Sequence, residues 1–177
     1  MGARSRVGNS PISLQGMFRG RNLLKLDDKG RISIPSRYRE IINANHGGSL
    51  VVSQGFFTEF PHLLIVPLDT WKGFELEFGG ADLFDTSIER FHARLRTMGG
   101  CEEARLDEHG RILVPAPYRA YAGLESEVAC AGMGRYLSLW KPASLEAAMA
   151  RAEKNLPEVR KHLAAQVTER PESPTGR

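Results

Sequence analysis

The sequence predicts an α+β fold in which two copies of a small β module are joined by linking helices and followed by a C-terminal helix. The main observation is a repeat: residues 26–39 read LDDKGRISIPSRYR, and residues 106–119, which begin 80 positions later, read LDEHGRILVPAPYR. Nine of these fourteen positions agree in identity or aliphatic class. Short stretches of alternating apolar residues surround each copy, and stretches with helical spacing lie between and after the copies. A unit of about 45 residues barely closes a core alone. We therefore expect the two copies to complete each other as an intramolecular pseudo-dimer.

The first copy is predicted to form a strand, a turn, a second strand and a short helix. A strand over residues 21–26 ends at Asp27, whose side chain can accept hydrogen bonds from backbone N–H groups further along a tight turn. Gly30 supplies the positive φ that such a turn needs. Apolar residues alternate over 32–34, and Pro35 then ends the strand and suits the start of a helix. We expect the turn to be the exposed end of a hairpin.

The same patterns divide the whole chain into six segments. These are a disordered extension (1–16), a first module (21–70), linking helices (71–100), a second module (101–144), a C-terminal helix (145–164) and a disordered tail (165–177). Pro157 should interrupt or kink the C-terminal helix. Pro117 should delay the start of the short helix in the second copy.

The composition excludes several classes of protein. The chain of 177 residues contains no run near the roughly 18 apolar residues of a membrane span. Its two cysteines, Cys101 and Cys130, lie far apart, which favours reduced and inert thiols. The five histidines are scattered, and no phosphate-binding glycine loop or nucleophile motif is present. We therefore expect neither an enzyme nor a protein that holds a metal or another cofactor.

Positive charge is concentrated in the first copy. Residues 1–40 contain nine basic and three acidic residues, whereas residues 41–100 contain four basic and seven acidic ones. Residues 101–140, which hold the second copy, contain four basic and six acidic residues. This asymmetry favours a polyanionic partner at the first copy. The plainer alternative is a solvated basic face.

The arginines near the first turn are candidate contacts to double-stranded DNA. A guanidinium group can bind phosphate bidentately or read guanine in the major groove, and a two-stranded hairpin fits that groove. The candidates are Arg19, Arg21, Lys29, Arg31, Arg37 and Arg39. The alternative is that Arg31 and Arg39 pair with Asp27 and fix the turn. The positions expected to shape the two copies are Asp27, Gly30, Pro35, Asp107, Gly110, Arg111, Pro115 and Arg119.

These residues resemble the motifs of a known family. The pattern Asp27-x-Lys29-Gly30-Arg31-x-x-x-Pro35-x-x-x-Arg39 and its second copy resemble the paired motifs of the MraZ family, and each copy resembles the AbrB-type swapped-hairpin module. Met-Phe-Arg-Gly at residues 17–20 is similar to the opening of that family, and the resemblance runs to about Leu163. The second copy departs from the pattern because His109 stands where the first copy has Lys29.

The resemblance implies a function that composition alone does not show. It implies a transcriptional repressor of the bacterial division and cell-wall gene cluster and of its own gene, in the cytoplasm and associated with the nucleoid. The protein would be a ring-shaped homo-oligomer that binds repeated promoter boxes, with DNA contacts in the segment 27–31. Two alternatives remain open. One is an antitoxin-like module that binds another protein, and the weaker one is an RNA-binding protein, which would need an aromatic stacking platform.

Overall fold

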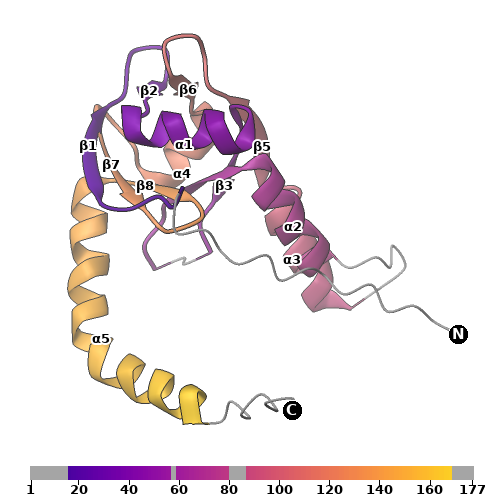
Figure 1. Cartoon of the computed structure of the whole chain (residues 1–177), viewed down its shortest axis with the longest axis vertical. Helices are drawn as coiled ribbons and strands as arrows, with labels where there is room; N and C mark the ends of the chain where they lie inside the picture. Colours follow the sequence, from indigo (N-terminus) through magenta and orange to yellow (C-terminus); the bar gives the residue numbers. More distant parts are fainter. Residues whose placement is uncertain (1–15, 57–58, 80–86, 169–177) are drawn as a thin grey trace, which may run out of the picture.

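The computed structural model describes residues 16–56, 59–79 and 87–168 (Figure 1). Residues 1–15 of the expected N-terminal extension lie outside the described residues, and Gly16 lies in a turn. The disordered tail predicted from residue 165 is wrong for its first four residues. Residues 165–168 form the last turn of a helix, and residues 169–177 lie outside the described part of the chain.

Each repeat contributes four strands and one helix to the described structure. The first repeat forms β1 (Arg21–Lys25), β2 (Arg31–Ser33), α1 (Ser36–His46), β3 (Ser49–Gln54) and β4 (Leu63–Pro67). The second forms β5 (Cys101–Arg105), β6 (Arg111–Leu113), α4 (Ala116–Ala122), β7 (Glu127–Gly132) and β8 (Leu137–Trp140). The linking helices are α2 (Leu68–Gly79) and α3 (Ile88–Thr97), and the C-terminal helix is α5 (Pro142–Thr168).

The strands of the two repeats exchange partners. A six-stranded sheet has the order β1-β7-β8-β4-β3-β5, and β2 and β6 form a separate two-stranded sheet. All of these pairings are antiparallel. The first strand of each repeat therefore pairs with the third strand of the other repeat, because β1 joins β7 and β5 joins β3. The structure confirms the α+β class that the sequence predicted.

The expected hairpin between the first two strands is largely absent. An isolated bridge between Leu26 and Ile32 joins the end of β1 to β2, together with the hydrogen bond from Asp27 N to the Arg31 carbonyl at 2.9 Å. Ile32 instead faces Ile112 in the pair formed by β2 and β6. This correction has a physical reason: both isoleucines are fully buried there, whereas a hairpin of β1 and β2 alone would leave one face of each strand uncovered.

One core lies between the sheet and the short helices of both repeats. Tyr38 and Ile42 of α1 are buried against it, and the ring of Phe18 meets that of Tyr38 edge to face with a centroid distance of 5.8 Å. Leu63 and Leu139, on the central strands β4 and β8, are also fully buried. A second, smaller cluster around Trp71 covers the other face where α2 packs. Both repeats therefore contribute to one core.

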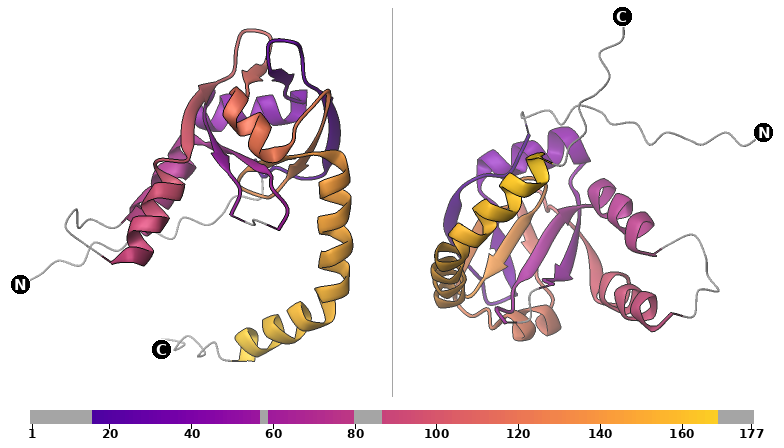
Figure 2. Two further views of the ribbon diagram at one scale, coloured as in Figure 1. Left: turned by 180° about the vertical axis from the view of Figure 1, so that it is seen from behind. Right: turned by 90° about the horizontal axis from the view of Figure 1, so that it is seen from below.

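The helices begin close to the positions that proline allows. α1 starts at Ser36 directly after Pro35 and ends at His46, and Gly47 follows it with φ +60°. α4 starts at Ala116, the position equivalent to Ser36, so the predicted delay by Pro117 is wrong. A proline in the first helical turn costs no hydrogen bond, because those N–H groups have no partner within the helix. α5 is a single helix that contains Pro157 and changes direction along its length (Figures 1 and 2).

The loops and the long helices lie at opposite ends of the sheet. Figure 1 shows the β1–β2 and β5–β6 loops projecting together at one end, while α2, α3 and α5 extend from the other. The view from below in Figure 2 places α5 on one side of the sheet and the α2–α3 pair on the other. Within the described residues, no helix is long and apolar enough to cross a membrane.

Candidate functional site

The two repeated motifs build two matching tips. The first tip comprises residues 27–31 and the second comprises residues 107–111. In the first, the Asp27 backbone carbonyl accepts from Gly30 N at 2.9 Å, and the carboxylate Oδ1 accepts from the backbone N–H groups of Lys29 and Arg31 at 3.0 and 2.8 Å. Gly30 has φ +79°, in the left-handed region that favours glycine. The predicted turn is therefore formed by the residues that suggested it.

The second tip repeats this geometry. The Asp107 carboxylate Oδ1 accepts from His109 N at 2.9 Å and from Arg111 N at 2.8 Å, and Gly110 has φ +72°. The backbone carbonyl of Asp107 also accepts from Gly110 N at 2.9 Å. Lys29 and His109 thus occupy equivalent positions, and both are exposed.

An ion pair fixes the base of each tip. Asp27 Oδ2 accepts from Arg31 Nε at 2.8 Å and lies 2.7 Å from Arg31 Nη2. The hydrogen bonds from Arg31 hold the pKa of Asp27 below its ordinary value. The Asp27 hydrogen bond raises the pKa of Arg31, and the negative charge of Asp107 in the second tip adds to this increase. Arg111 forms the same contact with Asp107, at 2.8 Å from Nε, and the pKa of Asp107 is likewise lowered.

These contacts favour the alternative in which Arg31 pairs with Asp27 and fixes the turn. They do not use all of the N–H donors of the Arg31 guanidinium group. A guanidinium group carries five N–H donors, and the contacts with Asp27 involve only Nε and Nη2. The Arg31 side chain remains 29% exposed. A ligand at the tip can therefore meet a guanidinium group whose orientation is already set by Asp27.

Arg39 and Arg119 hold the two tips together. Arg39 does not pair with Asp27, as the structural alternative expected; it reaches across to the second repeat, where Nη1 donates to the His109 carbonyl at 3.4 Å. Its side chain covers Gly110 so closely that a Cβ there would fall on Arg39 Cδ, and Arg119 covers Gly30 in the same way. Backbone hydrogen bonds support this exchange, from Ile34 N to the Gly110 carbonyl at 3.0 Å and from Val114 N to the Gly30 carbonyl at 2.9 Å.

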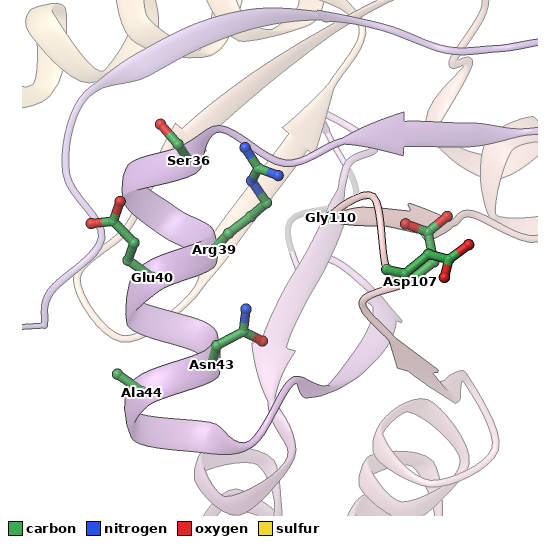
Figure 3. A pocket seen from close by; sticks show the side chains of 8 residues that line it. Ser36, Arg39, Glu40, Asn43, Ala44, Asp107 and Gly110 are labelled. Carbon is green, nitrogen blue, oxygen red and sulfur yellow. The ribbon is translucent and has the colours of Figure 1, made fainter.

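A shallow crevice of about 630 Å³ lies beside this contact (Figure 3). In Figure 3, Arg39 extends from α1 beside the loop that carries Asp107 and Gly110. Arg39 Nε is buried there without a hydrogen-bond partner among the described residues. The full lining is Ser36, Arg39, Glu40, Asn43, Ala44, Asp107, Glu108 and Gly110. Each of the two repeats contributes one wall of the crevice. The crevice therefore exists only when the repeats pack together in this exchanged arrangement.

The remaining predicted arginines lie at the other end of β1. Tyr38 OH donates to the Arg19 carbonyl at 2.6 Å and accepts from Arg37 Nη2 at 2.9 Å, and the Arg37 guanidinium also lies 4.6 Å from the centre of the Tyr38 ring. Arg21 Nη1 lies 2.8 Å from the Met149 sulfur on α5. A five-residue strand spans roughly 17 Å. The six predicted contacts therefore divide into a tip group, a distant group and Arg39 between the repeats.

The tips themselves carry little net charge. Together they contain three basic residues, Lys29, Arg31 and Arg111, against four acidic ones, Asp27, Asp28, Asp107 and Glu108. The only difference in formal charge between them is Lys29 against His109, with histidine counted as neutral. The constant offset of the repeat places His109 at the position of Lys29, but nothing in the sequence indicates that the two side chains belong to one surface. The strand exchange between the repeats brings the two tips together.

No metal site is evident in the part of the chain that the structure describes, where no group of three histidine, cysteine, aspartate or glutamate side chains gathers. The thiols also lack the features of a reactive site. Burial raises the pKa of the Cys130 thiol to about 12, and burial likewise raises the pKa of Cys101. Both groups are therefore neutral thiols at ordinary pH.

Comparisons with known proteins agree with the motifs. Residues 17–93 and 97–166 each match the family described as "MraZ protein, putative antitoxin-like". The "Transcriptional regulator MraZ" of Nitrosomonas eutropha is 40% identical over 129 residues, which cover 72% of this chain and 82% of that protein. The protein of the same name from Shewanella violacea is 38% identical over 128 residues, with the same coverage. The solution structure of PHS018 from Pyrococcus horikoshii covers 71% of this chain and 96% of its own at 16% identity, but its TM-score of 0.33 is too low to bear on the fold.

Proposed function

Because the chain belongs to the MraZ family, with both of its repeats matching the family pattern, we propose that it is a sequence-specific DNA-binding transcriptional repressor. Its relatives are named as transcriptional regulators, and the family is not one of enzymes. The prediction of a non-enzymatic regulator from the sequence is thereby confirmed at this level.

The observation that carries the proposal is the projection of two tied tips from one end of the molecule (Figure 1). Lys29 is exposed at the first tip, and Arg31 beside it is oriented by Asp27. A major groove about 12 Å wide admits a two-stranded β element. Arg31 would approach the base edges there, and Lys29 beside it would contact a phosphate at the edge of the groove. Arg39 would hold the tips at a fixed separation rather than contact DNA itself.

The distant arginines would bind the phosphate backbone. Arg19, Arg21 and Arg37 lie at the start of β1 and of α1, roughly a strand length from the first tip. Phosphate contacts position a protein on the duplex without reading its sequence. A duplex that crosses the first tip and follows β1 would meet both groups of basic side chains.

Self-association would supply the affinity that one module lacks. On α3, Ile88, Phe91 and Leu95 recur at helical spacing, and each side chain is more than half exposed. Such a stripe is typical of a surface that another chain covers. We propose that a second copy covers it and that the copies close into a ring, as the family resemblance implies. A ring that engages several evenly spaced promoter boxes gains affinity through effective concentration.

The finer features of the repressor follow from the same resemblance. The targets would be the division and cell-wall gene cluster and the protein's own gene, and the protein would act in the cytoplasm at the nucleoid. Residues 21–70 and 101–144 would form the two AbrB-like modules, residues 71–100 would link them, and residues 145–164 would form most of the C-terminal helix.

A gel shift on the DNA directly upstream of the protein's own gene tests this function. We expect the intact oligomer to shift that duplex, Arg31→Ala to abolish the specific shift, and Arg111→Ala to cost much less. Arg111 is a matched control because it makes the same ion pair in the second tip. Equal losses from the two variants would argue that the arginines act on the fold rather than on DNA.

A second candidate function rests on the description of the matching family as antitoxin-like. In that case the basic first repeat would meet an acidic protein surface, and α5, which extends from the sheet, would be the docking element. The two functions differ in their response to salt, because phosphate contacts give DNA affinity a steep salt dependence.

A further inference from the structure

The second tip carries a titratable side chain where the first carries a permanent cation. His109 and Lys29 follow their turn aspartates by two residues, and their backbone N–H groups donate to those carboxylates at 2.9 and 3.0 Å. The His109 side chain is 63% exposed, so it lies at the surface of its tip as Lys29 does. The two side chains are therefore equivalent in position and differ in the conditions under which they carry charge.

The tips are held together as one surface. Ile34 and Val114 donate across the repeats to the turn glycines, and Arg39 and Arg119 each cover the glycine of the opposite turn. Asp107 in the second tip also contributes to the raised pKa of Arg31 in the first, after the larger effect of Asp27, which places the two tips within electrostatic reach. A polyanion that docks on the first tip therefore also approaches the second.

Four charged groups lie beside His109, two at its imidazole ring and two at its backbone. Within its own loop, Glu108 Oε1 lies 3.6 Å from Nδ1, Arg111 Nη2 lies 3.4 Å from Nδ1, and Asp107 forms the turn. From α1, the guanidinium group of Arg39 contacts the His109 backbone carbonyl. One carboxylate and one guanidinium group thus contact the ring, and one of each contacts the backbone of His109, so that neither sign dominates its surroundings.

Protonation of His109 would make the two tips equal in charge. With a neutral imidazole, the second tip has two carboxylates, from Asp107 and Glu108, against the single guanidinium group of Arg111. The first tip has two carboxylates against two cations. Imidazole side chains commonly change charge between about pH 5 and 8. An added proton would therefore remove the net negative charge that opposes a phosphate at the second tip.

We propose that the second tip is a further DNA-binding site, in which protonated His109 contacts a backbone phosphate in the way that Lys29 does in the first tip. This inference rests on the proposed DNA-binding function and adds to it. The protein holds DNA with one tip in alkaline solution and with both tips in acidic solution. Its affinity for any duplex then rises as the pH falls, and so does the salt dependence of that affinity.

Fluorescence anisotropy on the intact protein tests the inference, with a labelled duplex from upstream of its own gene at pH 6.0 and 8.0 and constant ionic strength. One additional phosphate contact at about 0.1 M salt is worth about eightfold in affinity and steepens the log–log salt slope by about 0.9. For each second tip that engages DNA, we expect wild type to bind about eightfold more tightly at pH 6.0 than at pH 8.0. His109→Lys should bind at pH 8.0 as tightly as wild type does at pH 6.0, with no further gain on acidification.

Two control variants isolate the effect. His109→Gln should bind weakly at both pH values and lose the pH dependence, although His46 and His62 are unchanged in it. Lys29→Gln should weaken binding at both pH values by the same factor and keep the wild-type ratio.

The inference fails if His109→Gln keeps the wild-type ratio, or if His109→Lys binds no more tightly than wild type at pH 8.0. A wild-type protein that binds DNA equally at both pH values overturns the inference and leaves the proposed function intact. A wild-type protein that binds no DNA at either pH overturns both.

Discussion

Replacing Gly110 by alanine should destabilise the protein by much more than the same replacement at Gly47. Both glycines have positive φ, +72° and +60°, so each alanine meets the left-handed penalty of about 1–2 kcal/mol. At Gly47 nothing lies within 4 Å of the new Cβ. At Gly110 that atom falls on the side chain of Arg39, with Nε at 2.9 Å. The two sites therefore share a backbone cost and differ in the cross-repeat contact.

The additional cost follows from the displacement of Arg39. Overpacking of this kind typically costs about 1–3 kcal/mol. Adding the two effects gives a loss of about 3 kcal/mol in the free energy of unfolding for Gly110→Ala, against about 1 kcal/mol for Gly47→Ala. Gly30→Ala should lie between them, because its Cβ meets the end of the Arg119 side chain, which can move more easily than the middle of Arg39.

Urea denaturation followed by circular dichroism measures these losses. A double-mutant cycle of Gly110→Ala with Arg39→Ala isolates the contact, since removing the arginine side chain should relieve most of the overpacking. Equal losses at Gly110 and Gly47, or additive effects in the cycle, would refute the claim that Arg39 covers the second turn.

Two further predictions concern the core and the surface. His62 stacks on Trp140 with a centroid distance of 3.9 Å, and burial lowers its pKa below the ordinary value of 6.5, so the folded state binds fewer protons than the unfolded state. The stability that neutral His62 contributes is present above pH 6.5 and is lost as the pH falls below it. The Tm of wild type should therefore drop between pH 7.5 and 5.5, and His62→Phe should reduce that drop. If the drop in Tm is the same in His62→Phe, other groups cause it. On α3, Phe91→Asp should convert the oligomer into smaller species, measured by light scattering. The circular dichroism spectrum should stay unchanged, because Phe91 is 56% exposed. An unchanged mass would place the interface elsewhere.

Local features of the repeat were predictable because local chemistry determines them. The turn aspartates, the positive-φ glycines and the helix start after Pro35 all depend on neighbours within a few residues. The pairing of β3 with β4 and of β7 with β8 likewise joins strands that follow each other in the chain. For these elements, alternating apolar residues and turn residues carried enough information.

Contacts between the repeats were harder to predict because they depend on distant residues. Exposed and half-buried residues alternate along β1, a pattern that suits several partner strands. Nothing within the strand indicates that it pairs with β7, more than 100 positions away. Arg39 was assigned either to DNA or to Asp27, although it covers Gly110. A charge count locates the basic segment of the chain but does not show that β1 separates Arg19 and Arg37 from the first tip.

The most direct test of the central claim is the salt dependence of DNA affinity for the intact protein. The duplex from upstream of its own gene should be titrated between 50 and 200 mM salt at pH 8.0. If Lys29 and the three distant arginines all meet phosphates, the log–log slope should approach about −3.6 for one engaged subunit, and Lys29→Gln should make it shallower by about 0.9. A slope near zero, or one that Lys29→Gln leaves unchanged, would contradict the account that the first tip binds DNA.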